Sequence, residues 1–174
     1  MKIAGFYDES ISNGLGWRAV LFVSGCPHHC PGCHNEVAQN YDYGKEFNEQ
    51  EILERIQKNS ILNGITISGG EPLCKENISE VGKFIQDVRK IKPNFDVWCY
   101  TGYTLEQLEA RNDDTTNKVL QNIDVLVDGK FIQERKDISE EAKNMAFERI
   151  PSGYPGVDEV FDYIRMGDNV VWQV

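Results

Sequence analysis

The chain has 174 residues, 40% hydrophobic and 26% charged, which is ordinary for one soluble globular domain. Its formal net charge of −10, with no basic run to offset it, argues against a nucleic-acid-binding surface. The longest uninterrupted apolar stretch, residues 19–23, is far too short to span a membrane, so no membrane association is expected. The first residues lack the apolar core of a signal peptide, so we expect a cytoplasmic protein.

Hydrophobic patterns predict the elements in the first 130 residues. Residues 1–18 are expected to be a leading segment that ends in a glycine-containing turn. Residues 19–23 are apolar throughout, which is typical of a strand buried on both faces of a parallel sheet. Further strands are predicted at residues 64–67, 97–100 and 124–127. Helices are predicted after Asn48, over the apolar positions 78–88, and from Thr104; two of them begin with capping-box patterns.

The C-terminal part has weaker signals. A short helix is predicted at residues 139–147, and two closing strands at 160–164 and 170–174 flank a turn at 166–169. Strands that alternate with helices predict an α/β fold in a single domain over residues 1–174. We expect an incomplete (β/α) barrel or a curled, mostly parallel sheet, with a cysteine loop at the C-terminal end of the first core strand.

That loop contains three of the five cysteines, Cys26, Cys30 and Cys33, spaced Cys-x-x-x-Cys-x-x-Cys. Thiolates so close repel one another unless a cation lies between them, so the spacing indicates a metal centre in a reducing compartment. A structural zinc site with His28 or His34 as fourth ligand is one interpretation. A 4Fe–4S cluster with three protein-bound irons and one open iron is the other.

A second motif, Ser68-Gly69-Gly70-Glu71-Pro72, follows the strand predicted at 64–67 and precedes a helix. Glycines there bring the backbone close to whatever lies opposite, and their N–H and C=O groups could face a ligand. Taken alone, the pattern is more typical of a structural turn.

The two motifs in this order resemble the radical S-adenosylmethionine superfamily. The segments 13–18, 33–35, 100–103 and 124–132 are further similar to the activating protein of the anaerobic ribonucleotide reductase, a small, single-cluster family. An Arg-Gly-Ser-Ser-Asn-Gln type segment, usual in that family after the strand at 124–127, is missing here. This difference affects the identity of the partner and the contacts made by the C-terminal part of the chain. It does not affect the cluster and cofactor assignments.

The resemblance implies an iron–sulfur enzyme that reductively cleaves S-adenosylmethionine to methionine and a 5′-deoxyadenosyl radical. The radical then generates a glycyl radical on a partner enzyme, here the large subunit of anaerobic ribonucleotide reductase. A flavodoxin or ferredoxin would supply the electron, and a homodimer is compatible with the family. The resemblance assigns the metal to Cys26, Cys30 and Cys33. It assigns S-adenosylmethionine contacts to Gly32, Cys33, His34, Gly69, Gly70 and Glu71, and it names no general acid or base.

Two alternatives stay open. One is another small radical S-adenosylmethionine enzyme, which activates a different glycyl-radical enzyme or acts on a small molecule. The other is a zinc-stabilised interaction module without enzymatic activity. Of the remaining candidates, Cys74 and Cys99 are expected to be packing residues. His28 and His29 are expected to face solvent, and Asp128 to cap a turn or helix or to orient a cation or ribose.

Overall fold

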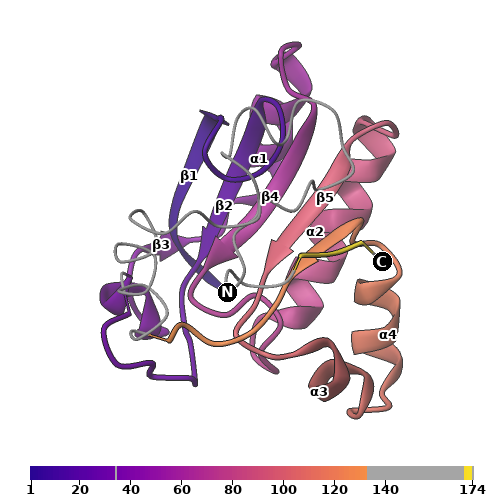
Figure 1. The fold of residues 1–174 in the computed structure, drawn as a ribbon. Coiled ribbons are helices and arrows are strands. Elements are labelled where there is room, and N and C mark those ends of the chain that lie inside the picture. Colours follow the sequence, from indigo (N-terminus) through magenta and orange to yellow (C-terminus); the bar gives the residue numbers. More distant parts are fainter. Residues whose placement is uncertain (34, 133–170, 174) are drawn as a thin grey trace, which may run out of the picture.

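A computed structural model describes residues 1–33, 35–132 and 171–173, which form an α/β fold (Figure 1). The strands are β1 (Lys2–Ser10), β2 (Arg18–Val23), β3 (Lys45–Glu46), β4 (Gly64–Gly69), β5 (Asp96–Tyr100), β6 (Val125–Val127) and β7 (Val171–Gln173). The helices are the 3-10 helix η1 (Glu36–Gln39) and the α-helices α1 (Glu49–Lys58), α2 (Ile78–Ile91), α3 (Leu105–Glu109) and α4 (Asp114–Leu120).

The strands form one seven-stranded sheet in the order β3-β1-β2-β4-β5-β6-β7. The four central strands, β2, β4, β5 and β6, are parallel to one another, and the strands outside them are antiparallel to their neighbours. The mostly parallel sheet predicted from the sequence is thus confirmed. Across the described residues the sheet runs from β3 to β7 without closing, so the barrel alternative is not formed there.

The core lies between the sheet and its helices. Leu21, Ile67 and Cys99 point to one face of the sheet, because they are paired in register across neighbouring strands. These buried side chains pack in one cluster with Ile56 of α1 and Phe84 of α2. Figure 1 shows α1 and α2 behind the sheet and α4 beside α2. The loops after β2, β4 and β5 therefore meet at one edge of the sheet.

Helices α1, α3 and α4 begin at side chains that accept backbone N–H groups. Asn48 caps α1, Asp113 caps α4, and Thr104 with Gln107 forms the predicted capping box of α3. Helix α2 ends just before Pro93, as its sequence predicts. None of the helices in the described part of the chain is long and apolar enough to cross a membrane.

The structure differs from the sequence prediction at several places. Residues 2–10 form strand β1, which pairs with both β2 and β3, whereas the sequence predicted only a leading segment that ends in a turn. Only Ile3 of this strand is buried, so it lacks the apolar alternation that would reveal it. Helix α4 was not predicted. The expected C-terminal strand is confirmed in part as β7, and the helix at 139–147, the strand at 160–164 and the turn at 166–169 lie outside the described residues.

A fully buried arginine, Arg18, fixes the N-terminal edge of the parallel strands. Its guanidinium donates to Asp96 Oδ1 on β5 at 2.8 Å and to Thr66 Oγ1 on β4 at 2.7 Å. It also donates to the carbonyl oxygens of Leu15 and Ile65. A buried charge is stable only when it is paired and hydrogen-bonded, and Arg18 meets both conditions. Strands β2, β4 and β5 are thereby tied together at the edge opposite the cysteine loop.

Replacing Arg18 by Met should lower the free energy of unfolding by about 3 kcal/mol, because buried acceptors lose their donors. Denaturant unfolding of the metal-free protein measures this loss. Arg55→Met is the matched control, since Arg55 pairs with Asp8 near the surface, and it should cost less than about 1 kcal/mol. Equal losses for the two variants would contradict the assigned role of Arg18.

Candidate functional site

The cysteine loop starts where β2 ends, at the C-terminal edge of the parallel strands. Its base is fixed to the segment that follows it, because Gly25 N–H donates to Ala38 O at 2.7 Å and Cys26 N–H donates to Gln39 O at 3.0 Å. Gly25 has a φ of +92°, and a Cβ there would lie 2.1 Å from the Tyr41 ring. Only glycine fits this position. The Tyr41 ring lies directly against Gly25 and so covers the start of the loop.

Two further residues of the loop, His29 and Gly32, have positive φ values, of 46° and 71°. They curve the chain so that Cys26, Cys30 and Cys33, all partly exposed, come from one short loop. Burial raises the pKa of the Cys26 thiol, the backbone N–H of His28 lowers it by a hydrogen bond, and the neighbouring charges of Glu71, Cys30 and Cys33 raise it.

Among the described residues, no three Cys, His, Asp or Glu side chains are already arranged around one point as a metal site requires. The donor set nevertheless fits an iron–sulfur cluster: three free thiols with the predicted spacing lie on a loop at the ligand-binding edge of the sheet. His34, expected beside the cofactor, lies outside the described residues.

The Gly-Gly-Glu-Pro turn packs directly against the cysteine loop. Gly70 N–H donates to Val23 O and Glu71 N–H donates to Gly25 O, both at 2.7 Å. A Cβ at Gly69 would lie 2.5 Å from backbone atoms of Val23, and one at Gly70 would lie 2.4 Å from Gly25 O. These glycines are required for close backbone approach, and the N–H groups of Gly70 and Glu71 are used within the protein.

The carboxylate of Glu71 is fully buried and accepts hydrogen bonds from three segments. Oε1 accepts from Leu73 N at 2.9 Å and from Thr101 Oγ1 at 2.7 Å. Oε2 accepts from Gly102 N at 2.7 Å and contacts His28 Nε2 at 2.8 Å. Two carboxylate oxygens have about four acceptor positions, so Glu71 is saturated by the protein itself.

The prediction that His28 faces solvent is wrong. Its side chain is 6% exposed, because the imidazole points inward to Glu71 and lies edge-on against the Tyr103 ring, with the centroids 4.4 Å apart. His29 is exposed, as predicted. Asp128 is a helix cap, since its Oδ2 accepts the Leu105 N–H at the start of α3 at 2.8 Å.

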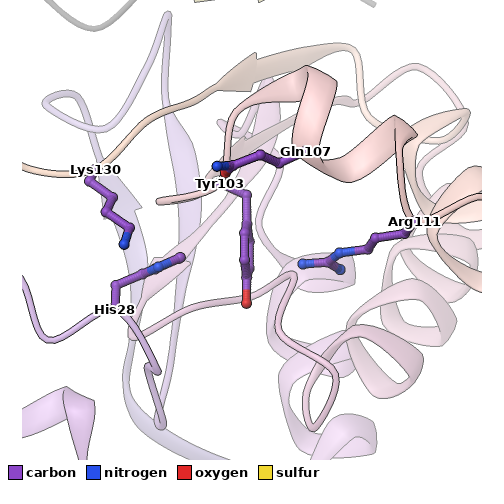
Figure 2. Close-up of a pocket in the computed structure, with 5 residues that line it drawn as sticks. All are labelled: His28, Tyr103, Gln107, Arg111 and Lys130. Atoms are coloured by element: carbon purple, nitrogen blue, oxygen red, sulfur yellow. The ribbon is translucent and has the colours of Figure 1, made fainter.

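Beside the cysteine loop is a pocket of about 290 Å³, lined by His28, Tyr103, Gln107, Arg111 and Lys130. Figure 2 shows the Tyr103 ring between the side chains of His28 and Arg111, with Lys130 above His28. The Arg111 guanidinium lies 4.2 Å from the Tyr103 ring centroid and donates to Leu73 O at 2.7 Å. The pocket thus has two cationic side chains at the ligand-binding edge of an acidic protein.

The predicted site residues of the described chain, Gly32, the three loop cysteines and the Gly-Gly-Glu turn, lie at one edge of the sheet. Sequence analysis did not identify Thr101, Arg111 or Lys130 as parts of the site. The segment at 100–103 carried the only signal for Thr101, through its resemblance. Cys74 and Cys99 are buried, which confirms the prediction that they are packing residues.

Burial raises the pKa of the Cys74 thiol to about 11, and hydrogen bonds from the Asn77 backbone and Tyr41 offset only part of that rise. At pH 8 only roughly one Cys74 in a thousand is then a thiolate, the form that reacts. Iodoacetamide should therefore modify Cys30 and Cys33 of the metal-free protein well before Cys74 and Cys99. Peptide mass spectrometry over time measures the order, and equal rates for Cys74 and Cys30 would contradict it.

Glu71→Gln should lower the free energy of unfolding by about 2 kcal/mol, because an NH₂ group replaces an oxygen that faces donors. Denaturant unfolding of the metal-free protein tests this. Glu54→Gln is the control: Glu54 is about half exposed and faces Lys58 on α1, so the change should stay within about 0.5 kcal/mol. A Glu71→Gln protein as stable as the control would show that the four contacts are not needed for folding.

Known proteins resemble most of this chain. Residues 12–151 match the family described as a 4Fe-4S single cluster domain. The anaerobic ribonucleoside-triphosphate reductase-activating protein of Escherichia coli K12 is 41% identical over 143 residues, which is 80% of this chain and 90% of that protein. The protein of the same name from Haemophilus influenzae is 40% identical over 143 residues, with 80% and 90% covered. The protein of that name from phage T4 is 35% identical over 134 residues, with 75% and 81% covered.

These relatives confirm the resemblance first seen in the motifs. The matched region includes the cysteine loop, the Gly-Gly-Glu-Pro turn and the loop after β5. Most of the chain is covered at about 40% identity, and it therefore belongs to the family of anaerobic ribonucleoside-triphosphate reductase-activating proteins.

Proposed function

We propose that this chain is a radical S-adenosylmethionine enzyme that generates a glycyl radical on an anaerobic ribonucleotide reductase. The observation that carries the proposal is the direct packing of the Gly-Gly-Glu-Pro turn on a loop of three free thiols at the C-terminal edge of a parallel sheet. The names of the relatives support the partner, and the matched 4Fe-4S family supports the cluster.

In this proposal Cys26, Cys30 and Cys33 hold three irons of one 4Fe–4S cluster, and the fourth iron is left for S-adenosylmethionine. A cluster bound there would supply the one electron for reductive cleavage of the sulfonium to methionine and a 5′-deoxyadenosyl radical, and this radical would take a hydrogen atom from a glycine of the partner. The electron comes from an external one-electron donor such as a flavodoxin or ferredoxin.

The chain's own residues bind and orient the cofactors. Gly32, Cys33 and His34 are assigned to S-adenosylmethionine by resemblance. At the Gly-Gly-Glu turn, the carbonyl oxygens of Gly69 and Gly70 are better acceptors for the ammonium group than Glu71, whose oxygens are already saturated. The cations Arg111 and Lys130 are suited to the carboxylate of the same ligand, because opposite charges attract at a partly exposed site.

Homolysis of the sulfonium bond needs no general acid or base, so the site is proposed to work by positioning alone. Glu71 holds the turn, the loop after β5 and His28 in one arrangement. The Tyr41 ring covers the base of the cysteine loop. Both features favour a fixed cofactor geometry over a flexible one. The five free thiols fit a reducing cytoplasm, and a homodimer remains compatible with the proposal.

The proposal is tested anaerobically. The protein is reconstituted with iron and sulfide, reduced and mixed with S-adenosylmethionine, and 5′-deoxyadenosine and methionine are assayed. Both products should form with the wild-type protein and be lost in Cys26→Ala, because removing one of three ligands removes the cluster.

Cys74→Ala is the matched control and should retain the cluster and the cleavage activity, since Cys74 is a buried packing residue. Cluster loss in this control would overturn the three-ligand assignment. A folded wild-type protein that retains zinc, takes up no cluster and forms no 5′-deoxyadenosine would support the interaction-module alternative. Cleavage without radical formation on a ribonucleotide reductase would support a different substrate.

A further inference from the structure

Beyond its fixed base, the cysteine loop forms an arch, residues 27–32. Three residues of the arch are exposed and have no side-chain group that can hydrogen-bond: Pro27, Pro31 and Gly32. Cys30 is a proposed metal ligand. His29 is exposed and contacts Gln39 at 3.0 Å, in the same segment that holds the base of the loop. His28 is therefore the residue of the arch whose side chain can tie it to another part of the fold.

The imidazole of His28 lies in a seat formed by Glu71, Gly102 and Tyr103, where its side chain is only 6% exposed. Nε2 is 2.8 Å from Glu71 Oε2, which also accepts the Gly102 N–H at 2.7 Å. Because an ionised carboxylate only accepts hydrogen bonds, the imidazole donates Nε2–H. The ring lies edge-on to Tyr103, with the centroids 4.4 Å apart. These contacts tie the arch to the turn after β4 and to the loop after β5.

The absence of a side chain at Gly102 makes room for this ring. A Cβ there would lie 2.4 Å from His28 Cδ2 and 2.7 Å from Nε2. The backbone of Gly102 is outside the left-handed region, so its own conformation does not require glycine. The position of the imidazole is thus the reason why a larger residue does not fit at position 102.

The far side of the seat is also supported. Figure 2 shows the Tyr103 ring between the side chains of His28 and Arg111. The Arg111 guanidinium lies 4.2 Å from the ring centroid and donates to Leu73 O at 2.7 Å. Tyr103 is therefore held from both sides, and the seat is a firm support for the imidazole.

We propose that the seat formed by Glu71, Gly102 and Tyr103 anchors the cysteine loop through His28 and thereby strengthens metal binding by the three thiols. The inference rests on the proposed role of the loop cysteines as metal ligands. Among the described residues the thiols are not yet arranged around one point, so they must move when a metal binds. An arch that is already tied down has fewer conformations to lose in that step. Releasing it should weaken metal binding about tenfold, which corresponds to the cost of ordering roughly one residue.

The test uses two variants that break the same contact from opposite sides. His28→Ala empties the seat, whereas Gly102→Ala fills it and displaces an intact imidazole. The double variant combines both changes. His28→Gln is the conservative variant, because its side-chain amide can donate an N–H to the same carboxylate. His29→Asn is the matched control, since the positive φ of 46° at position 29 is one that Asn tolerates.

Two quantities are measured without a cluster or S-adenosylmethionine. The metal-free, reduced protein is titrated anaerobically with Co²⁺, and the thiolate-to-cobalt absorbance gives the dissociation constant. Hydrogen exchange followed by mass spectrometry reports the order of the arch in the metal-free protein, with peptides from β2 and β4 as the reference for the intact fold.

His28→Ala and Gly102→Ala should each weaken Co²⁺ binding about tenfold and speed exchange in the arch, while β2 and β4 stay protected. The double variant should bind Co²⁺ no more weakly than either single variant, because both changes break one contact. His28→Gln should bind nearly as the wild type does, and His29→Asn should leave both quantities unchanged.

Wild-type Co²⁺ affinity in either alanine variant would overturn the inference. Additive losses in the double variant, or exchange that is faster in β2 and β4 as well, would also overturn it. If His28→Ala does not fold, the comparison of Gly102→Ala with the wild type decides. A Gly102→Ala protein that does not fold either would show that the seat supports the whole fold, and would overturn the inference too.

Failure of the proposed function gives a different result. A wild-type protein that shows these effects on Co²⁺ binding but forms no 5′-deoxyadenosine refutes the proposed function and supports the anchor. A wild-type protein that cleaves S-adenosylmethionine, with variants that bind Co²⁺ unchanged, refutes the anchor alone. A wild-type protein that binds neither Co²⁺ nor a cluster refutes both.

Discussion

The arrangement of the site depends on one buried carboxylate, that of Glu71. Its two oxygens are contacted by Leu73, Thr101, Gly102 and His28, which belong to three loops far apart in the sequence. A buried carboxylate is destabilising unless donors fill its acceptor positions. Losing any one of these partners would therefore cost free energy, and this cost keeps each partner in place. Backbone hydrogen bonds between strands align the strands but not the loops that follow them. The contacts of the Glu71 carboxylate fix the positions of these loops relative to one another.

A second buried charge, that of Arg18, links separate segments at the opposite edge of the sheet. Arg18 joins β2, β4 and β5 through Thr66, Asp96 and nearby carbonyl oxygens, with all its interactions made inside the fold. An open sheet, unlike a closed barrel, does not fix its curvature by closure. One cation and one anion at opposite ends of the same parallel strands therefore hold the sheet's geometry. Between these two charges, the apolar face of the sheet packs against α1 and α2 and supplies most of the buried apolar surface.

The central strands could be predicted from the sequence because their apolar, β-branched residues reflect burial on both faces. Strand β1 could not, because only Ile3 is fully buried in it and its position follows from pairing with β2. The cysteines and the Gly-Gly-Glu turn were found because their spacing is local. The place of His28 was missed because it is determined by Glu71, which is 43 residues away, and no local pattern encodes that contact.

The charges around Cys26 act in opposite directions on any negative centre held there. The carboxylate of Glu71 raises the pKa of the Cys26 thiol, and the same negative potential disfavours the addition of an electron nearby. The His28 amide acts in the opposite sense on the same sulfur. Arg111 and Lys130 add positive charge from the pocket side, where a ligand's own carboxylate would neutralise it. Since Glu71 positions the three loops, its negative charge beside Cys26 is a fixed feature of the site.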